Sequence, residues 1–247
     1  MKEAGRGKQE GEGDVGAVIV AAGSATRMAG VDKVFAPLAG VPLIARTLMA
    51  FQACPAVSRL VLVLAHENLE RGRSLAAEGG FGKVSAVCAG GPRRQDSVRL
   101  GLEALRRRSG QALGECDWVA VHDGARPLVT QALIERALEA ARETGAAVPA
   151  LPIVDTVKET DAGGSIVRTV DRGRLFAVQT PQVFRYDLLL RAHREIERDV
   201  TDDAAMLEAL GLPVKVFPGE RRNIKITTPE DLELAEAILS TRARVAP

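Results

Sequence analysis

Residues 16–33 read GAVIVAAGSATRMAGVDK, and this stretch decides the fold that we expect. Its first part, residues 17–20, is short, apolar and rich in β-branched side chains, which is typical of a buried strand in a parallel sheet. Small residues follow at 21–25, and small side chains let a backbone approach an anion and turn its N–H groups toward it. Two cations, Arg27 and Lys33, come next. A strand, a small-residue loop and two cations together predict a site for a phosphorylated nucleotide.

The loop by itself leaves a second interpretation open. An ordinary turn between a strand and a helix, carrying two solvated cations, would contain the same residue types. The loop has neither the G-x-x-x-x-G-K-[ST] pattern of a Walker A motif nor the G-x-G-x-x-G pattern of a dinucleotide-binding turn. Other parts of the chain therefore have to decide between the two interpretations.

The composition favours a protein that acts on small molecules. The chain has 247 residues, of which 46% are hydrophobic, enough for the core of one large α/β domain or two small ones. Aromatic residues make up only 3%, which argues against stacking platforms for single-stranded nucleic acid. The 33 Lys and Arg are balanced by 32 Asp and Glu, so neither nucleic acid nor a membrane surface is an expected partner. No apolar run approaches the ~18 residues of a membrane span.

The cysteines and the first residues indicate a cytoplasmic protein. Cys54, Cys88 and Cys116 are scattered and form no C-x-x-C pair, which is typical of reduced thiols. Residues 1–14 are polar and rich in glycine, and they lack the apolar core of a signal peptide. We expect them to form a disordered tail.

Strands and helices alternate in the prediction as far as residue 150. Strands are expected at 60–65, 84–88, 118–121 and 146–150, and helices at 43–51, 67–78, 94–107 and 131–143. This alternation predicts a three-layer, doubly wound, mostly parallel sheet with right-handed crossovers. Turns that follow parallel strands gather at the carboxyl edge of the sheet, where open α/β folds bind ligands.

Residues 152–175 break this rhythm and predict a protruding β-hairpin arm. Strand-like runs at 155–158 and 166–170 flank a turn that contains DAGG at 161–164. An arm that leaves a compact domain needs a partner surface, so we expect exchange of the arm across a homodimer. A hairpin folded over its own sheet is the alternative.

The remaining chain completes one domain. After the arm we expect a strand at 177–184 and helices at 186–197, 203–210 and 229–239. The prediction is thus a single domain over 15–241, with 152–175 as its dimerisation arm and with tails at 1–14 and 242–247.

Seven segments in order carry a resemblance to a known family. The loop AAGSATRM with Lys33 resembles the signature loop of cytidylyltransferases with a nucleotidyltransferase Rossmann-like fold. The other segments are AGGPRRQDSV at 89–98, HDGARP at 122–127, TVDR at 169–172, QTPQ at 179–182, TDDA at 201–204 and NIKIT at 223–227. Taken together they are similar to the 2-C-methyl-D-erythritol 4-phosphate cytidylyltransferase family over residues 16–239.

The resemblance implies a reaction and its partners. It implies transfer of CMP from CTP to 2-C-methyl-D-erythritol 4-phosphate, with release of pyrophosphate, in the non-mevalonate synthesis of isoprenoid precursors. It also implies Mg²⁺ held mainly by the triphosphate and water, and a cytoplasmic homodimer. Three alternatives stay open: ribitol 5-phosphate as the acceptor, a uridylyl- or guanylyltransferase, and a non-catalytic nucleotide-binding protein of the same fold.

The resemblance also implies residue roles. The cations that would hold the CTP phosphates and stabilise the transition state are Arg27, Lys33 and Lys225. The residues that would contact cytosine, ribose and phosphate are Ala21, Ala22, Gly23, Gly91 and Ser97. The residues that would grip the acceptor are Asp123, Arg126, Thr156, Arg172, Thr180 and Thr201. Arg172, at the base of the arm, would serve either its own site or that of the partner.

Some positions depart from the family pattern or stay unassigned. Ala25 stands where the family usually has glycine, and it would cost ~1–2 kcal/mol if that position needs a positive φ. Asp32 replaces a usual proline, and Gly124 replaces a usual alanine. We interpret His122 as a structural turn residue, and the sequence identifies no partner for His193.

Overall fold

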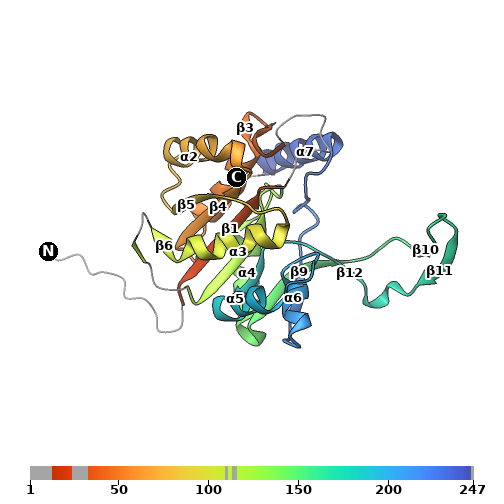
Figure 1. The fold of residues 1–247 in the computed structure, drawn as a ribbon. Coiled ribbons are helices and arrows are strands. Elements are labelled where there is room, and N and C mark those ends of the chain that lie inside the picture. The colour runs from red at the N-terminus through yellow and green to blue at the C-terminus, as the bar shows by residue number, and fades with distance from the viewer. Residues whose placement is uncertain (1–12, 24–32, 109–110, 113–115, 246–247) are drawn as a thin grey trace.

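The computed structural model describes residues 13–23, 33–108, 111–112 and 116–245 (Figure 1). Most of the predicted N-terminal tail, and the loop that holds Ala25, Arg27 and Asp32, lie outside these ranges. The strands of the main sheet are β1 (Val15–Ala21), β4 (Arg59–Leu64), β5 (Val84–Ala89), β8 (Trp118–Asp123), β9 (Ala146–Pro152), β12 (Phe176–Val178), β13 (Gln182–Arg185) and β14 (Lys215–Pro218). The α-helices are α1 (Leu43–Ala53), α2 (Leu69–Glu78), α3 (Arg94–Leu105), α4 (Gln131–Thr144), α5 (Tyr186–Glu195), α6 (Ala204–Ala209) and α7 (Pro229–Val245).

Short elements fill the connections between these. The paired strands outside the main sheet are β2 (Pro37–Leu38) with β3 (Val41–Pro42), β6 (Arg107–Arg108) with β7 (Gln111–Ala112), and β10 (Val157–Thr160) with β11 (Ile166–Val170). The 3₁₀ turns are η1 (Lys33–Phe35), η2 (His66–Asn68) and η3 (Arg172–Arg174).

The central sheet is mostly parallel. In the described residues it has eight strands, in the order β12-β9-β13-β8-β1-β4-β5, with β14 also paired to β9. Strand β1 runs parallel to both β4 and β8, and β5 runs parallel to β4. Strand β13 is antiparallel to β8 and β9, and β12 is antiparallel to β9. The expected doubly wound sheet is confirmed, with an antiparallel section toward β12.

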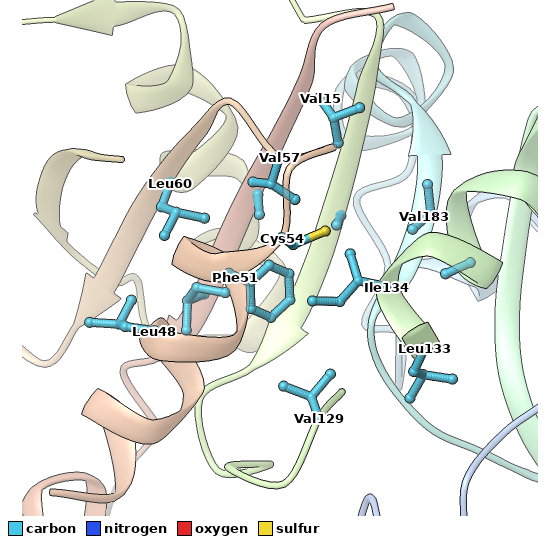
Figure 2. Packing of buried hydrophobic residues seen from close by; sticks show 14 of the residues in the cluster. Val15, Leu48, Phe51, Cys54, Val57, Leu60, Val129, Leu133, Ile134 and Val183 are labelled. Carbon is cyan, nitrogen blue, oxygen red and sulfur yellow. The ribbon is translucent and has the colours of Figure 1, made fainter. Parts of the chain in front are cut away.

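Helices cover both faces of the sheet, so the architecture has three layers. Successive side chains of a strand point to opposite faces, and β1 divides accordingly: Ala17 and Ile19 join one core cluster and Val18 joins the other. Helices α1 and α4 pack on the first face, and α3, α5 and α6 pack on the second. Figure 2 shows Phe51 of α1 and Ile134 of α4 in the first cluster. The near-continuous apolar runs of β1 and β4 follow from this burial on two sides.

The parallel strands end level with one another. The register pairs Ala21 of β1 with Leu64 of β4, Leu64 with Ala89 of β5, and Val20 with Asp123 of β8. The loops that follow these four strands therefore meet at one edge, as the sequence predicts, and this edge carries the candidate site.

The structure corrects several predicted boundaries. Strand β8 runs on through Asp123, two residues beyond the predicted end, so His122 and Asp123 belong to the strand and not to the turn. The predicted strand over 177–184 is wrong as a single element: β12 and β13 are separated at residues 179–181, where Pro181 has no N–H to donate to a ladder and follows a cis peptide bond. Helix α7 continues to Val245.

The β-hairpin arm is confirmed. Strands β10 and β11 pair in antiparallel fashion and project from the body of the molecule (Figure 1). Asp161 shapes the turn, because its carboxylate accepts hydrogen bonds from the backbone N–H groups of Gly163 and Ser165, each at 2.9 Å. Ile166 and Val167 are 63% and 60% exposed in the single chain, so the arm leaves apolar side chains uncovered.

The described residues contain no helix that is both long and apolar enough to span a membrane.

Candidate active site

A cavity of about 570 Å³ opens at the carboxyl edge of the sheet. Its wall is formed by the end of β1, the turn η1, the turn η2 after β4, the turn after β5, the end of β8 with the segment after it, and the segment that holds Lys225. The lining residues that carry charged or polar side chains are Lys33, Glu67, Asn68, Arg93, Arg94, Ser97, Asp123 and Lys225. The cavity thus joins the described end of the predicted nucleotide loop to Asp123, one of the predicted acceptor residues.

Asp123 lies at the centre of a cluster of cations. Its Oδ2 atom is 2.9 Å from Nζ of Lys225 and 3.6 Å from Nε of Arg126. Its Oδ1 atom is 3.6 Å from Nε of Arg94. Burial raises the pKa of this carboxyl, but the cations, Lys225 foremost, outweigh burial and hold the pKa below its ordinary value. Arg94 also pairs with Asp203, so three positive charges face two carboxylates, and the surplus of one positive charge suits an anionic ligand.

His122, beside Asp123, is a structural residue with both ring nitrogens engaged. Nε2 lies 3.1 Å from the carbonyl oxygen of Arg126, and because a carbonyl only accepts, we assign the ring proton to Nε2. Nδ1 then accepts from the hydroxyl of Thr180 at 3.0 Å, and that hydroxyl accepts the backbone N–H of Asp123 at 3.1 Å. These bonds fix the backbone of Asp123, and they use the hydroxyl of Thr180 inside the protein.

Burial of His122 predicts a pH-dependent stability. Burial lowers the pKa of His122 from 6.5 to about 4. Between these values the unfolded chain holds a proton that the folded chain does not, so the free energy of unfolding falls as the pH falls. From pH 7 to pH 5 we expect a loss of about 2 kcal/mol, measured by urea denaturation.

Two variants test the assignment. His122→Gln should remove most of the difference between pH 7 and pH 5, whereas His66→Gln, at an exposed position, should retain it. An undiminished difference in His122→Gln would contradict the assignment. The comparison stops at pH 5 because carboxyl groups, with ordinary pKa values near 4, begin to bind protons below it.

The glycine turn after β5 reaches the cavity wall at Gly91. A Cβ atom on Gly90 would lie 2.3 Å from Cβ of Ala22, and one on Gly91 would lie 2.4 Å from Cβ of Asp96, so only glycine fits at either position. The hydroxyl of Ser97 accepts the N–H of Gly91 at 3.1 Å and contacts the carbonyl oxygen of Arg93 at 3.2 Å. Ser97 therefore holds the turn closed, a structural task that sequence reasoning did not assign to it.

Arg93 ties this turn to a distant loop. Its guanidinium contacts Asp96 of the same turn and, at 2.8 Å, Asp199. Gln95 adds hydrogen bonds to the backbone of residues 198 and 200. The loop that leads to the TDDA segment is thus fastened to the start of α3.

The nucleotide loop is described only in part. Ala21, Ala22 and Gly23 end β1 and line the cavity, and Lys33 lines it from η1. Arg27 lies outside the described residues. A Cβ atom on Gly23 would meet no atom of the described residues within 4 Å.

The other predicted acceptor residues lie away from the cavity wall of their own chain. Thr156 and Arg172 are exposed in the arm, where a guanidinium N–H of Arg172 donates to the carbonyl oxygen of Val154. Thr201 is exposed ahead of α6. Arg126 does reach the cluster, where its Nη1 donates to the carbonyl oxygen of Asn223 at 2.9 Å.

Sequence reasoning missed two residues of the cluster. Arg94 lies in the AGGPRRQDSV segment directly after β5, and that position at the carboxyl edge is the signal that identifies it. Asp203, whose Oδ2 is 2.7 Å from Nη1 of Arg94, is 109 positions away in the sequence, and no local pattern signals this contact.

Comparison with known proteins identifies the family of this chain. The family model of IspD, 2-C-methyl-D-erythritol 4-phosphate cytidylyltransferase, matches residues 15–241. A protein of that name from Dehalococcoides mccartyi (strain CBDB1) is 50% identical over 225 residues, which are 91% of this chain and 96% of the relative. Another, from Pelotomaculum thermopropionicum, is 44% identical over 235 residues, covering 92% of this chain and 95% of the relative.

Solved structures agree as well. The crystal structure of 2-C-methyl-D-erythritol 4-phosphate cytidylyltransferase from Thermus thermophilus is 37% identical with a TM-score of 0.71, covering 91% of this chain and 98% of that one. The 4-diphosphocytidyl-2C-methyl-D-erythritol synthase of Anaerococcus prevotii has a TM-score of 0.79 at 29% identity, covering 93% and 97%.

Proposed function

This chain belongs to the 2-C-methyl-D-erythritol 4-phosphate cytidylyltransferase family, and we propose that the cavity around Asp123 is where it transfers CMP from CTP to 2-C-methyl-D-erythritol 4-phosphate. The activity is that of a nucleotidyltransferase of isoprenoid biosynthesis. One observation carries the assignment to this cavity. Lys225, Arg94 and Arg126 converge on one buried carboxylate at the sheet edge, beside the glycine turn and Lys33.

The chemistry needs charge stabilisation more than proton transfer. A phosphate oxygen of the acceptor attacks the α-phosphorus of CTP in line, a new P–O bond forms, and the bond to the β-phosphate breaks to release pyrophosphate. The nucleophile is already anionic, so no general base is required. His122 does not have to act as one, and its two ring nitrogens are occupied inside the protein.

On the CTP side, Lys33 and Arg27 hold the triphosphate, and Lys225 reaches the α-phosphate from the opposite wall. The backbone of Ala21, Ala22 and Gly23 and the turn at Gly91 and Ser97 bind the cytidine. The support for this division is that Lys33, Gly91 and Lys225 all line the same cavity.

On the acceptor side, Asp123 accepts hydrogen bonds from hydroxyl groups and Arg126 attracts the phosphate. Thr180 and Thr201 complete this half of the site. Because the hydroxyl of Thr180 is already engaged by His122 and Asp123, its contribution is to hold Asp123 in place.

Thr156 and Arg172 complete the site of a second copy. The chain is a single domain over 15–241, and its arm at 152–175 exchanges in a homodimer. The support is that both residues are exposed in an arm with uncovered apolar side chains, including Ile166 and Val167. A monomer in light scattering at micromolar concentration would contradict this arrangement.

Mg²⁺ accompanies the nucleotide. Among the described residues no group of three or more His, Cys, Asp or Glu side chains is placed to hold a metal, and both oxygens of Asp123 face cations. This arrangement suits a metal that is held by the triphosphate and water. The Asp123 carboxylate would accept a hydrogen bond from a metal-bound water. When bound, Mg²⁺ neutralises phosphate charge. Loss of turnover in EDTA, restored by Mg²⁺, is the expected result.

We place the enzyme in the cytoplasm, because its three cysteines are free thiols. Recovery of the protein in a fraction outside the cytoplasm would contradict this.

The direct experiment is pyrophosphate release from CTP and Mg²⁺ with two acceptors in parallel. We expect turnover with 2-C-methyl-D-erythritol 4-phosphate and little with ribitol 5-phosphate. Turnover with ribitol 5-phosphate alone would retain the nucleotide site and the chemistry but overturn the proposed acceptor.

A further inference from the structure

A second carboxylate, Asp203, lies behind Asp123 and is joined to it through Arg94. Arg94 is the first residue of α3. Its Nε is 3.6 Å from Oδ1 of Asp123, and its Nη1 is 2.7 Å from Oδ2 of Asp203. One guanidinium therefore contacts a carboxylate at the cavity and another in the interior.

The buried side chain of Asp203 does not cap α6, the helix that follows it. Its side chain is only 1% exposed, and a carboxylate this deep is costly unless it is paired. The N-terminus of α6 is capped by its neighbour, because Oδ1 of Asp202 accepts the backbone N–H of Ala205 at 3.0 Å. Burial raises the pKa of Asp203, but Arg94 and His193 outweigh it and lower that pKa, so the side chain is ionised. Arg94 is its main partner.

His193 of α5 supports Asp203 on its other oxygen. Its side chain is 2% exposed, and Nε2 is 3.3 Å from Oδ1 of Asp203. Neither atom forms a hydrogen bond among the described residues, so the two side chains meet in a close contact of buried polar atoms. The histidine to which the sequence assigns no partner thus packs against the carboxylate that holds Arg94.

Arg94 determines how the Asp123 carboxylate is turned. Lys225 and Arg126 both contact Oδ2, and Arg94 contacts Oδ1. A guanidinium is planar and rigid, so fixing its Nη1 end at Asp203 also fixes its Nε end at Asp123. Without the inner contact, Oδ1 would lose the cation that orients it.

We propose that Asp203, supported by His193, is a positioning residue that acts through Arg94 to orient the Asp123 carboxylate toward the hydroxyl groups of the acceptor. The inference rests on the proposed function, because it requires Asp123 to contact the acceptor. The proposal implies that three residues, His193, Asp203 and Arg94, together determine how well the acceptor binds.

The test is a double-mutant cycle on the KM of the acceptor. Asp203→Asn should raise that KM roughly tenfold, with a change in the KM of CTP below about twofold, and Arg94→Lys should raise the acceptor KM at least as much. Because Asp203 acts through Arg94, the double variant should be no worse than Arg94→Lys alone. Multiplied effects in the double variant, or an Asp203→Asn enzyme with a lower kcat and an unchanged acceptor KM, would show a merely structural role.

Controls separate positioning from folding and from the proposed function. Asp202→Ala removes the cap of α6 and the bond from Gln182 but leaves Arg94 and Asp203 in contact, so it should lower the melting temperature without changing the acceptor KM. If Asp203→Asn does not fold, His193→Gln replaces it and should raise the acceptor KM about threefold, but not in the Arg94→Lys background. An inactive wild-type enzyme would refute the proposed function; an active one with additive effects would refute only this inference.

Discussion

Replacement of Lys225 by alanine is expected to lower kcat by about 10²-fold or more, with little loss of stability. Its ammonium lies 2.9 Å from Asp123, lines the cavity and is 44% exposed, so it is available to an incoming phosphate. In the variant, the Lys225 ammonium is no longer present to stabilise the negative charge that develops on the α-phosphoryl group. Asp123 still pairs with Arg94 and Arg126 in this variant, so the charge of its buried carboxylate stays compensated and the fold is retained.

Steady-state pyrophosphate release at saturating CTP and acceptor measures the effect. Lys215→Ala is the matched control, because Lys215 also pairs with a carboxylate, that of Glu143, and is 36% exposed, but lies on β14 and does not line the cavity. Its kcat should equal that of the wild type. A loss below about threefold in Lys225→Ala would contradict the role given to this lysine.

Replacement of Arg172 by alanine is expected to abolish most turnover, and mixing with Lys225→Ala is expected to restore part of it. If the arm delivers Arg172 to the partner, a dimer of the two variants contains one site with both Lys225 and Arg172 intact. Random pairing places the variants together in about half of the dimers, so about one quarter of all sites is complete. Co-expression with two affinity tags and double purification selects the mixed dimers, in which one of the two sites is complete, so the purified dimer should have about half of the wild-type activity.

An arm that serves its own chain gives the opposite result. Each site in the mixed dimer would then lack either Lys225 or Arg172, and activity would stay at the level of the single variants. Arg168→Ala is the control on the same arm, because Arg168 is exposed and pairs with Glu159 of the neighbouring strand. Its loss should leave turnover unchanged.

The sequence predicts the fold where one physical rule dominates. The apolar runs of β1 and β4 are buried on both faces, and helical periodicity identifies α3 and α4, so alternation alone leads to a doubly wound sheet. Glycines 90 and 91 mark the turn after β5 because the Cβ atoms of Ala22 and Asp96 leave no room for another Cβ there. The arm is predictable because it breaks the alternation.

The contacts within the site are less predictable, because they join residues far apart in the chain. Asp203 and Arg94 are 109 positions apart, and Thr180 and His122 are 58 positions apart. Spacing cannot show that the hydroxyl of Thr180 is engaged inside the protein. Nor can spacing show that the side chain of Gln179 bonds the backbone of Glu220 and Asn223, more than 40 positions away.

The most direct test of the proposed reaction is ³¹P NMR of the purified protein with CTP, Mg²⁺ and 2-C-methyl-D-erythritol 4-phosphate. We predict the loss of the three CTP resonances and the growth, in equal amounts, of pyrophosphate and of a diphosphodiester with two coupled phosphorus signals. Unchanged CTP, or CMP and pyrophosphate without the diphosphodiester, would contradict transfer of the cytidylyl group to this acceptor.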